Sequence, residues 1–157
     1  MTQAMRVITA KAVFDAVNLL SNKAVLIADG VIIDVIDKEK VYDATQIEDF
    51  GNSVISAGLI DLQLNGNGGV LFNDSISFAS LETMHQTNLR FGTTSYLPTL
   101  ITSDLNDVRT ALEVTKEWFK QYGNTRGVIG LHLEGPFLSK EKRGIHPLEF
   151  VTLPTDA

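Results

Sequence analysis

Residues 57–69 read Ala57-Gly58-Leu59-Ile60-Asp61-Leu62-Gln63-Leu64-Asn65-Gly66-Asn67-Gly68-Gly69, and the pattern of apolar residues changes at this stretch. Leu59 to Leu64 form a nearly continuous apolar run, which predicts a strand buried on both faces. Further strands are predicted over residues 94–97 and 128–133, with a helix over residues 75–90 that Gly92 ends. The order β-α-β-α-β predicts a parallel sheet with right-handed crossovers.

A second helix is predicted between the last two strands, because apolar side chains recur there at steps of three and four. Its buried face is predicted to be Leu105, Val108, Leu112, Thr115 and Phe119. We expect Thr102 or Ser103 to cap its start and Gly123 to end it.

The sequence before this stretch has a different pattern. Residues 23–28 and 31–37 are rich in Val and Ile and flank Asp29-Gly30. Asp-Gly is typical of a type I′ turn, so a β-hairpin is predicted. Residues 7–10 and 54–56 are expected to be further strands. The domain boundary is therefore predicted between residues 56 and 57.

A third helix should follow the third strand, but a polar loop begins at Gly135 instead. Three βα strands cannot close a barrel of eight, and an open sheet of three strands would leave its edges exposed. We therefore expect the chain to be the N-terminal part of a longer protein.

Composition excludes several classes of function. The chain has 157 residues, of which 44% are hydrophobic, and 19 acidic against 13 basic residues give a net charge of −6. This balance argues against nucleic acid as a partner. The lack of cysteine excludes disulfides, thiolate nucleophiles and Cys-ligated zinc. No apolar run is long enough for a membrane span, and the start lacks a secretory signal, so we expect a cytoplasmic protein.

Polar residues cluster where the three strands end, and function gathers at the carboxyl ends of parallel strands. The first strand ends in Gln63 and Asn65, which point to the same side, the second ends near Thr99, and His132 and Glu134 share a face of the third. Gln63 and Asn65 either bind a functional group or hydrogen-bond the next turn.

Glu134 has two interpretations. A carboxylate that ends a buried strand is either a metal or acid/base group or one member of an ion pair. His132 is either part of that site or a half-buried imidazole. His146 lies on a loop that could cover the site and donate a proton, or it is an exposed loop residue. His85 is expected to be structural.

The glycines at positions 66, 68 and 69 do not form a nucleotide-binding motif. Position 71 is Leu71, so the dinucleotide fingerprint fails, and no Gly-Lys-Ser/Thr follows. We expect a tight turn that requires positive φ angles.

Four segments carry a resemblance to a known family. They are residues 57–69 with Phe72-Asn73-Asp74, then Gly92-Thr93-Thr94-Ser95-Tyr96-Leu97-Pro98-Thr99-Leu100, then Gly130-Leu131-His132-Leu133-Glu134-Gly135-Pro136-Phe137-Leu138, and Lys142-Arg143-Gly144-Ile145-His146-Pro147. Their order and spacing resemble the first three barrel strands of the N-acetylglucosamine-6-phosphate deacetylases, which are amidohydrolases. The resemblance covers essentially the whole chain but only the first part of the family's length.

The resemblance implies a fold and a reaction. The expected fold is α/β: residues 1–56 form part of a small β-sandwich, and residues 57–157 form the first three strands of a truncated (β/α)8 TIM-type barrel. The expected reaction is the hydrolysis of N-acetylglucosamine 6-phosphate to glucosamine 6-phosphate and acetate, in amino-sugar metabolism. The expected cofactor is one divalent metal ion, zinc or iron, and the full-length protein is expected to be a homo-oligomer.

The resemblance also implies roles for individual residues. Glu134 is expected to bind the metal, and His146 to polarise the acetyl carbonyl. Gln63 and Asn65 stand where many relatives carry His-x-His, so we expect a single metal, with both amides and His132 orienting ligands or water. The family's other metal ligands and its acid/base aspartate would lie beyond residue 157, so this chain alone is expected to be inactive and poorly folded.

Two alternatives remain open. Another amidohydrolase could act on a cyclic amide or an aminated base, although Gln63 and Asn65 argue against the usual His-x-His. A short non-catalytic chain could instead bind a full-length copy, or the sequence is a partial record of a gene.

Overall fold

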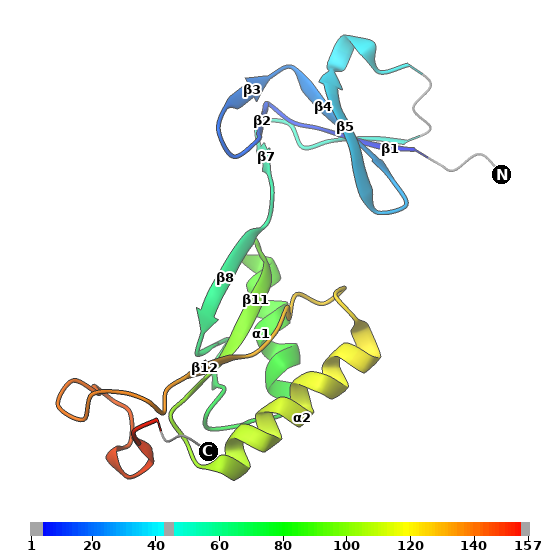
Figure 1. Cartoon of the computed structure of the whole chain (residues 1–157). Helices are drawn as coiled ribbons and strands as arrows, with labels where there is room; N and C mark the ends of the chain where they lie inside the picture. Colours follow the sequence, from blue (N-terminus) through cyan, green and yellow to red (C-terminus); the bar gives the residue numbers. More distant parts are fainter. Residues whose placement is uncertain (1–4, 43–45, 155–157) are drawn as a thin grey trace. The chain divides into compact units, whose positions relative to one another are not determined.

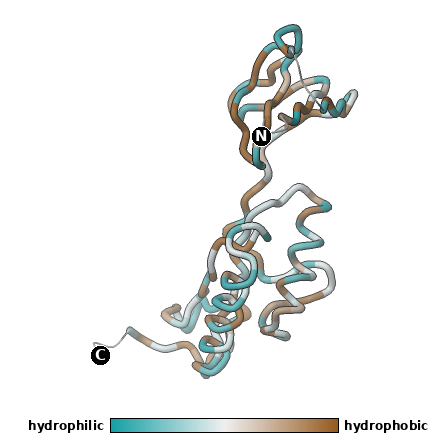
Figure 2. The backbone as a smooth tube through the Cα atoms, turned by 90° about the vertical axis from the view of Figure 1, so that its right-hand side faces the viewer, coloured by the Kyte–Doolittle hydropathy of each residue, from teal (hydrophilic) through white to brown (hydrophobic). Residues whose placement is uncertain are grey.

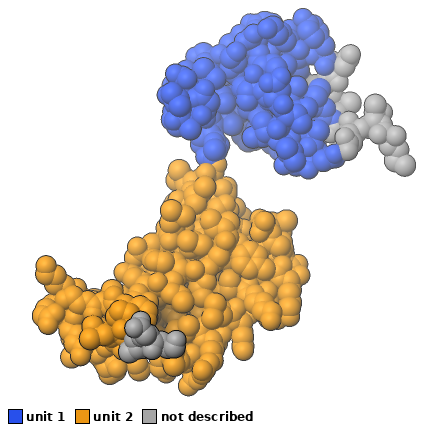
Figure 3. Space-filling model, in the orientation of Figure 1, with its two compact units in different colours: residues 1–57 blue, residues 58–157 orange. Residues whose placement is uncertain are grey.

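A computed structural model describes residues 5–42 and 46–154. The start of the chain at residues 1–4 and its end at residues 155–157 lie outside the described residues. The chain divides into two compact units, Met1–Ala57 and Gly58–Ala157, which Figure 3 colours separately. Among the described residues, none of the helices is long and apolar enough to cross a membrane.

Unit 1 contains two small sheets, with strand orders β5-β4-β1-β6 and β3-β2-β7. The strands are β1 (Arg6–Thr9), β2 (Ala12–Phe14), β3 (Leu19–Ser21), β4 (Lys23–Ala28), β5 (Val31–Asp37), β6 (Gln46–Asp49) and β7 (Val54–Ser56), with a short 3-10 helix η1 (Lys38–Lys40). Buried residues of unit 1 come from both sheets, among them Val7 of β1, Val13 of β2 and Val25 of β4.

The predicted hairpin is confirmed. β4 and β5 pair antiparallel, and Asp29 and Gly30 between them both have positive φ angles, 51° and 76°. These are the angles that a type I′ turn requires. The predicted strands at residues 7–10 and 54–56 correspond to β1 and β7, and β1 pairs antiparallel with β4.

Unit 2 contains a parallel sheet of order β12-β11-β8 and two helices that follow the predicted β-α-β-α-β order (Figure 1). Its elements are β8 (Leu59–Leu64), β9 (Gly66–Asn67), β10 (Val70–Leu71), α1 (Phe78–Arg90), β11 (Thr93–Ile101), α2 (Leu105–Tyr122), β12 (His132–Glu134) and the 3-10 helix η2 (Leu148–Phe150). β8 has the predicted bounds, whereas β11 begins one residue before the predicted strand over residues 94–97 and continues to Ile101.

The third strand is shorter than predicted. Residues 128–133 were expected to form it, but the ladder with β11 covers only His132–Glu134, and Val128 contributes one isolated bridge to Tyr96. The interruption coincides with Gly130, where an added Cβ would lie 2.9 Å from Leu97. His132 and Glu134, the two predicted site residues of this strand, nevertheless lie on the paired segment.

The core of unit 2 lies between β11 and the two helices. It consists of Phe72, Leu81, Met84, Tyr96, Leu100, Ala111, Trp118 and Val128. Hydrophobic residues recur along the helices between hydrophilic ones (Figure 2). This is the pattern of helices that bury one face.

The buried face of α2 matches the predicted one in part, because Thr115 is buried and Val108 and Phe119 pack against the core. Ala111, Thr115 and Trp118 are buried, whereas Leu105 and Leu112 are more than half exposed. The large Trp118 ring packs against Phe78, with ring centroids 4.7 Å apart, and this contact rotates the buried stripe away from Leu112. The predicted cap was also wrong, because the Asp104 side chain accepts from two main-chain N–H groups of the first turn. Gly123 ends the helix as predicted.

The expectation that β8 is buried on both faces was wrong for the described chain. Leu59, Ile60 and Leu62 are each more than half exposed. β8 is an edge strand of this sheet, with β11 as its neighbour, so its apolar side chains lack the cover that a central strand has.

His85 generates a prediction about pH. It is buried on α1 beside Trp118, and burial lowers the pKa of its imidazole below the ordinary value of 6.5. The folded state therefore favours the neutral ring. His85 costs no stability above its ordinary pKa, but the free energy of unfolding decreases as the pH falls below that value, because the unfolded chain binds the proton more readily. We expect His85→Gln to reduce the loss of stability between about pH 7.5 and about pH 5.5, measured by urea unfolding. An unchanged loss would contradict this assignment.

Candidate functional site

Strand register brings polar residues together at one end of the sheet in unit 2. In the parallel β11–β12 ladder, Thr99 lies opposite His132 and Ile101 lies opposite Glu134. On the other side of β11, Pro98 lies opposite Leu64 of β8. The carboxyl ends of all three strands therefore meet, as expected for parallel strands.

Glu134 is the centre of this group. Its Oε2 accepts a hydrogen bond of 3.0 Å from the Gln63 side-chain amide, which comes from β8. Its Oε1 lies 3.6 Å from His146 Nε2. The structure thus brings together three of the residues that the sequence predicts for the site, although 71 positions separate Gln63 from Glu134.

His146 is not an exposed loop residue, because only 8% of it is accessible. Its Nδ1 lies 2.9 Å from the hydroxyl of Thr102, the residue that follows β11, and 3.4 Å from the Thr102 main-chain N–H, which donates to it. The loop that begins at Gly135 thus returns the imidazole to the strand ends, with its other nitrogen, Nε2, on the Glu134 side.

The two remaining predicted residues lie close by but make different contacts. His132 Nδ1 hydrogen-bonds to the Thr99 hydroxyl at 3.1 Å, between neighbouring strands. The main-chain carbonyl of Asn65 accepts from the N–H of Phe72, which closes the turn after β8. His132 is half-buried, as one of its two interpretations required.

Sequence reasoning missed two residues that organise this end of the sheet. Thr102 was considered only as a helix cap, and its hydroxyl also donates to the main-chain carbonyl of Glu134 at 3.1 Å. The Asn73 side chain accepts from the N–H of Ile101 and donates to its carbonyl. Polar residues directly after a strand were the available signal, but their partners are distant in the sequence.

The glycine-rich segment forms a tight turn, as predicted. β9 and β10 form a short hairpin, with positive φ angles of 63° at Gly68 and 86° at Gly69. A Cβ at Gly68 would also lie 2.3 Å from the Thr87 hydroxyl on α1. The segment therefore needs glycine for conformation and packing.

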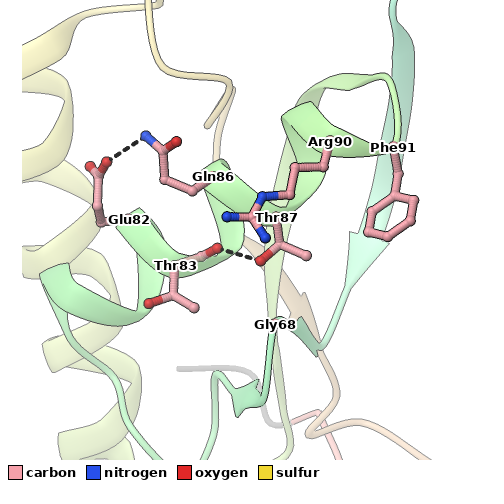
Figure 4. Close-up of a pocket in the computed structure, with 7 residues that line it drawn as sticks. All are labelled: Gly68, Glu82, Thr83, Gln86, Thr87, Arg90 and Phe91. Carbon is pink, nitrogen blue, oxygen red and sulfur yellow. Dashed lines mark hydrogen bonds between the residues drawn. The ribbon is translucent and has the colours of Figure 1, made fainter.

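Unit 2 has several hollows, of which two bear on the predicted site residues and on the glycine-rich turn. One of about 220 Å³ lies beside the strand ends and is lined in part by Thr102, Glu134 and Gly135. The other, of about 470 Å³, lies on α1, where Gln86 donates to Glu82 and Thr87 to the carbonyl of Thr83 (Figure 4). The α1 hollow is lined by Gly68, Glu82, Thr83, Gln86, Thr87, Arg90 and Phe91. Its lining shares no residue with the Glu134 group.

The donor set at the strand ends fits part of a metal site. Glu134 offers a carboxylate that Gln63 orients, and His146 Nε2 lies near it. Within residues 5–42 and 46–154, however, no group of three His, Cys, Asp or Glu side chains could hold a metal ion. A catalytic zinc needs three protein ligands, so this part of the chain supplies an incomplete set.

Comparison with known proteins identifies relatives. No family model matches the sequence. The N-acetylglucosamine-6-phosphate deacetylase of Haemophilus influenzae is 39% identical over 139 residues, which are 88% of this chain and 36% of that protein. The crystal structure of the N-acetylglucosamine-6-phosphate deacetylase from Pasteurella multocida matches with a TM-score of 0.89 and 41% identity, over 96% of this chain and 39% of that one. The chain is a relative of the N-acetylglucosamine-6-phosphate deacetylases.

The predicted resemblance is thus confirmed, although these deacetylases are much longer than this chain. The chain spans about a third of the length of the curated deacetylases that it matches. An N-acetylgalactosamine-6-phosphate deacetylase from Shewanella sp. strain ANA-3 is 37% identical over 133 residues, 83% of this chain and 33% of that protein. The deacetylase names leave the alternative of a cyclic amidohydrolase without support.

Gly135 generates a prediction about the geometry of the site. Its φ is +99°, and a Cβ there would lie 2.0 Å from the Thr102 hydroxyl. Gly144 on the same loop has φ +63° but open space around it, so it is a matched control. We expect Gly135→Ala to lower the free energy of unfolding by about 1–3 kcal/mol more than Gly144→Ala does, because only the first adds a steric clash. Equal losses in urea unfolding would contradict the close packing of Gly135 on Thr102.

Proposed function

We propose that this chain is part of a metal-dependent deacetylase that hydrolyses N-acetylglucosamine 6-phosphate to glucosamine 6-phosphate and acetate. One observation carries the proposal: Gln63, Glu134 and His146 converge at the strand ends of a chain that is 39% identical to such a deacetylase over 139 residues. The chain covers about a third of that relative, so the activity is proposed for the full-length protein and not for this chain alone.

The proposed fold of the full-length protein is a (β/α)8 barrel. The parallel order β12-β11-β8, with a helix before each next strand, supports this proposal, because it is the repeating pattern of such barrels. In this proposal residues 57–157 are the first units of the barrel, and the strands of residues 1–56 are part of a small β-sandwich.

Glu134 is proposed to hold one divalent metal ion, zinc or iron, together with ligands from outside the described residues. When bound, the metal supplies a water activated at neutral pH. A carboxylate at the end of a strand suits either metal, and the amide from Gln63 orients it. Gln63 and Asn65 carry no charge, which favours one metal over two.

His146 is proposed to donate a hydrogen bond to the acetyl carbonyl oxygen. Its Nε2 lies on the Glu134 side, and the ring is buried, so a hydrogen bond there acts in a medium of low dielectric constant. Donation strengthens as negative charge develops on the carbonyl oxygen, which lowers the barrier. Gln63, Asn65 and His132 are proposed to orient ligands and water around these two groups.

A second sugar phosphate is a candidate substrate. The Shewanella relative acts on the galactosamine epimer, by its name, and its identity to this chain is nearly the same. We therefore propose a 6-phosphorylated N-acetylhexosamine as the substrate class, with the glucosamine form first. We also propose that the full-length protein is a cytoplasmic homo-oligomer without nucleic-acid or membrane partners. The net charge of −6 and the small-molecule substrate named for these deacetylases agree with the lack of a nucleic-acid partner.

The function is tested in the full-length protein by acetate release from both sugar phosphates. We expect turnover of N-acetylglucosamine 6-phosphate, and we expect Glu134→Ala to lose bound metal and activity together, because removing one charged ligand opens the metal site. The matched control is Glu141→Ala, since Glu141 is a loop carboxylate that accepts from Ser139. Release from neither sugar, or full metal content in Glu134→Ala, would contradict the proposal.

His146→Gln separates the proposed hydrogen bond from metal binding. We expect kcat to fall by roughly 10²–10³, the loss seen when a donor to a developing oxyanion is removed, while metal content is unchanged. Metal analysis and steady-state kinetics on one preparation check both statements. A wild-type kcat would remove His146 from the reaction.

A further inference from the structure

Thr102 presents two polar groups to one nitrogen of His146. Its hydroxyl lies 2.9 Å from Nδ1, and its main-chain N–H donates to the same atom at 3.4 Å. Thr102 is itself 4% exposed and His146 8%, so water has little access to either group. The pair therefore constrains the imidazole through one of its two ring nitrogens.

The main-chain N–H can only donate, whereas a ring nitrogen donates or accepts according to the tautomer. The main-chain contact therefore favours an accepting Nδ1, which leaves the proton of the neutral ring on Nε2. We propose that Thr102 is a positioning residue that keeps His146 in this tautomer and directs the Nε2–H group toward the Glu134 side of the site.

The surroundings of Thr102 support a fixed position. Its hydroxyl also donates to the main-chain carbonyl of Glu134 at 3.1 Å, so its single proton is shared between that oxygen and Nδ1. One side chain thereby connects the end of β11, the end of β12 and the returning loop. Asn73 bonds both main-chain groups of the preceding Ile101. Gly135 leaves the space that the hydroxyl occupies, since a Cβ there would lie 2.0 Å away.

The consequence for catalysis rests on the proposed function. An Nε2–H group can donate to a carbonyl oxygen, whereas the other tautomer would direct a lone pair toward the same oxygen and repel it. Thr102 would then contribute to kcat through His146, without touching the substrate.

Nitrogen NMR of the full-length protein labelled with ¹⁵N-histidine tests the tautomer without any assay of activity. We expect the His146 proton on Nε2 in the wild type. Thr102→Ser keeps the hydroxyl and should keep this tautomer. Thr102→Val leaves only the longer contact from the main chain, so a second tautomer should become populated. A wild-type proton on Nδ1 would overturn the inference even if no variant folded.

Thr99→Val is the matched control. Thr99 is also a buried threonine of the β11 end, but its hydroxyl contacts His132 Nδ1 and not His146. We expect its removal to change the His132 signals and leave those of His146 unchanged. A change at His146 of the same size as in Thr102→Val would show a general loss of packing and overturn the specific role of Thr102.

Kinetics in the same variants test the catalytic consequence. We expect Thr102→Val to lower kcat about tenfold, as for the loss of one hydrogen bond, with KM within about twofold, and Thr102→Ser to stay near the wild type. In a His146→Gln background, Thr102→Val should have no further effect, because the residue it positions is absent. An equal loss in both backgrounds would overturn the inference. If the wild type released no acetate but kept the Nε2 proton, the proposed function would fail and the positioning role would stand.

Discussion

The parallel pairing of β11 with β12 determines where Glu134 and its neighbours at the strand ends lie. Because Ile101 pairs with Glu134, the residues after them, Thr102 and Gly135, are neighbours. A register shift of one residue would turn Glu134 to the opposite face of the sheet, away from Gln63. The ladder has only three residue pairs, so its register depends on the packing of the strands against the core.

That packing is an aromatic and aliphatic core around β11. Tyr96 is fully buried, and its hydroxyl donates to the carbonyl of Leu81 at 2.9 Å, which connects β11 to α1. Burial also raises the pKa of the Tyr96 hydroxyl, so it remains a donor at any physiological pH. In the same core, Trp118 contacts Phe78 and Tyr122. The strands thus end on a rigid base, which suits a site that must orient small groups.

Much of this arrangement could be predicted from local patterns. Asp29-Gly30 predicted the hairpin because its chemistry is local, and the β-α-β-α-β order followed from hydrophobic spacing. The same spacing placed Gln63 and Glu134 at one edge of the sheet, whereas for His146 it left open both a site role and an exposed loop. The spacing predicted the buried Thr115 of α2 but not Ala111 and Trp118, which lie two turns apart on one face and are buried in place of Leu105 and Leu112. Thr102 and Asn73 were missed as site residues because their partners are determined by register and loop return, which single-sequence patterns do not encode.

The position of His146 also shows why sequence spacing alone was ambiguous. A histidine on a polar loop is usually exposed, yet here the loop returns and buries it against the residue after β11. Burial required a strand end with free donors and a glycine opposite them. Thr102 and Gly135 provide both, and neither is unusual by itself.

The exposed apolar residues of β8 have a practical consequence for handling the chain. Leu59, Ile60 and Leu62 lie on an edge strand, whose main-chain groups can pair with any other extended segment. In concentrated solution such an edge favours association of one copy with another through added strands. We then expect β8, at the opposite edge of the sheet from β12, to determine how readily the isolated 157-residue chain aggregates during expression and purification.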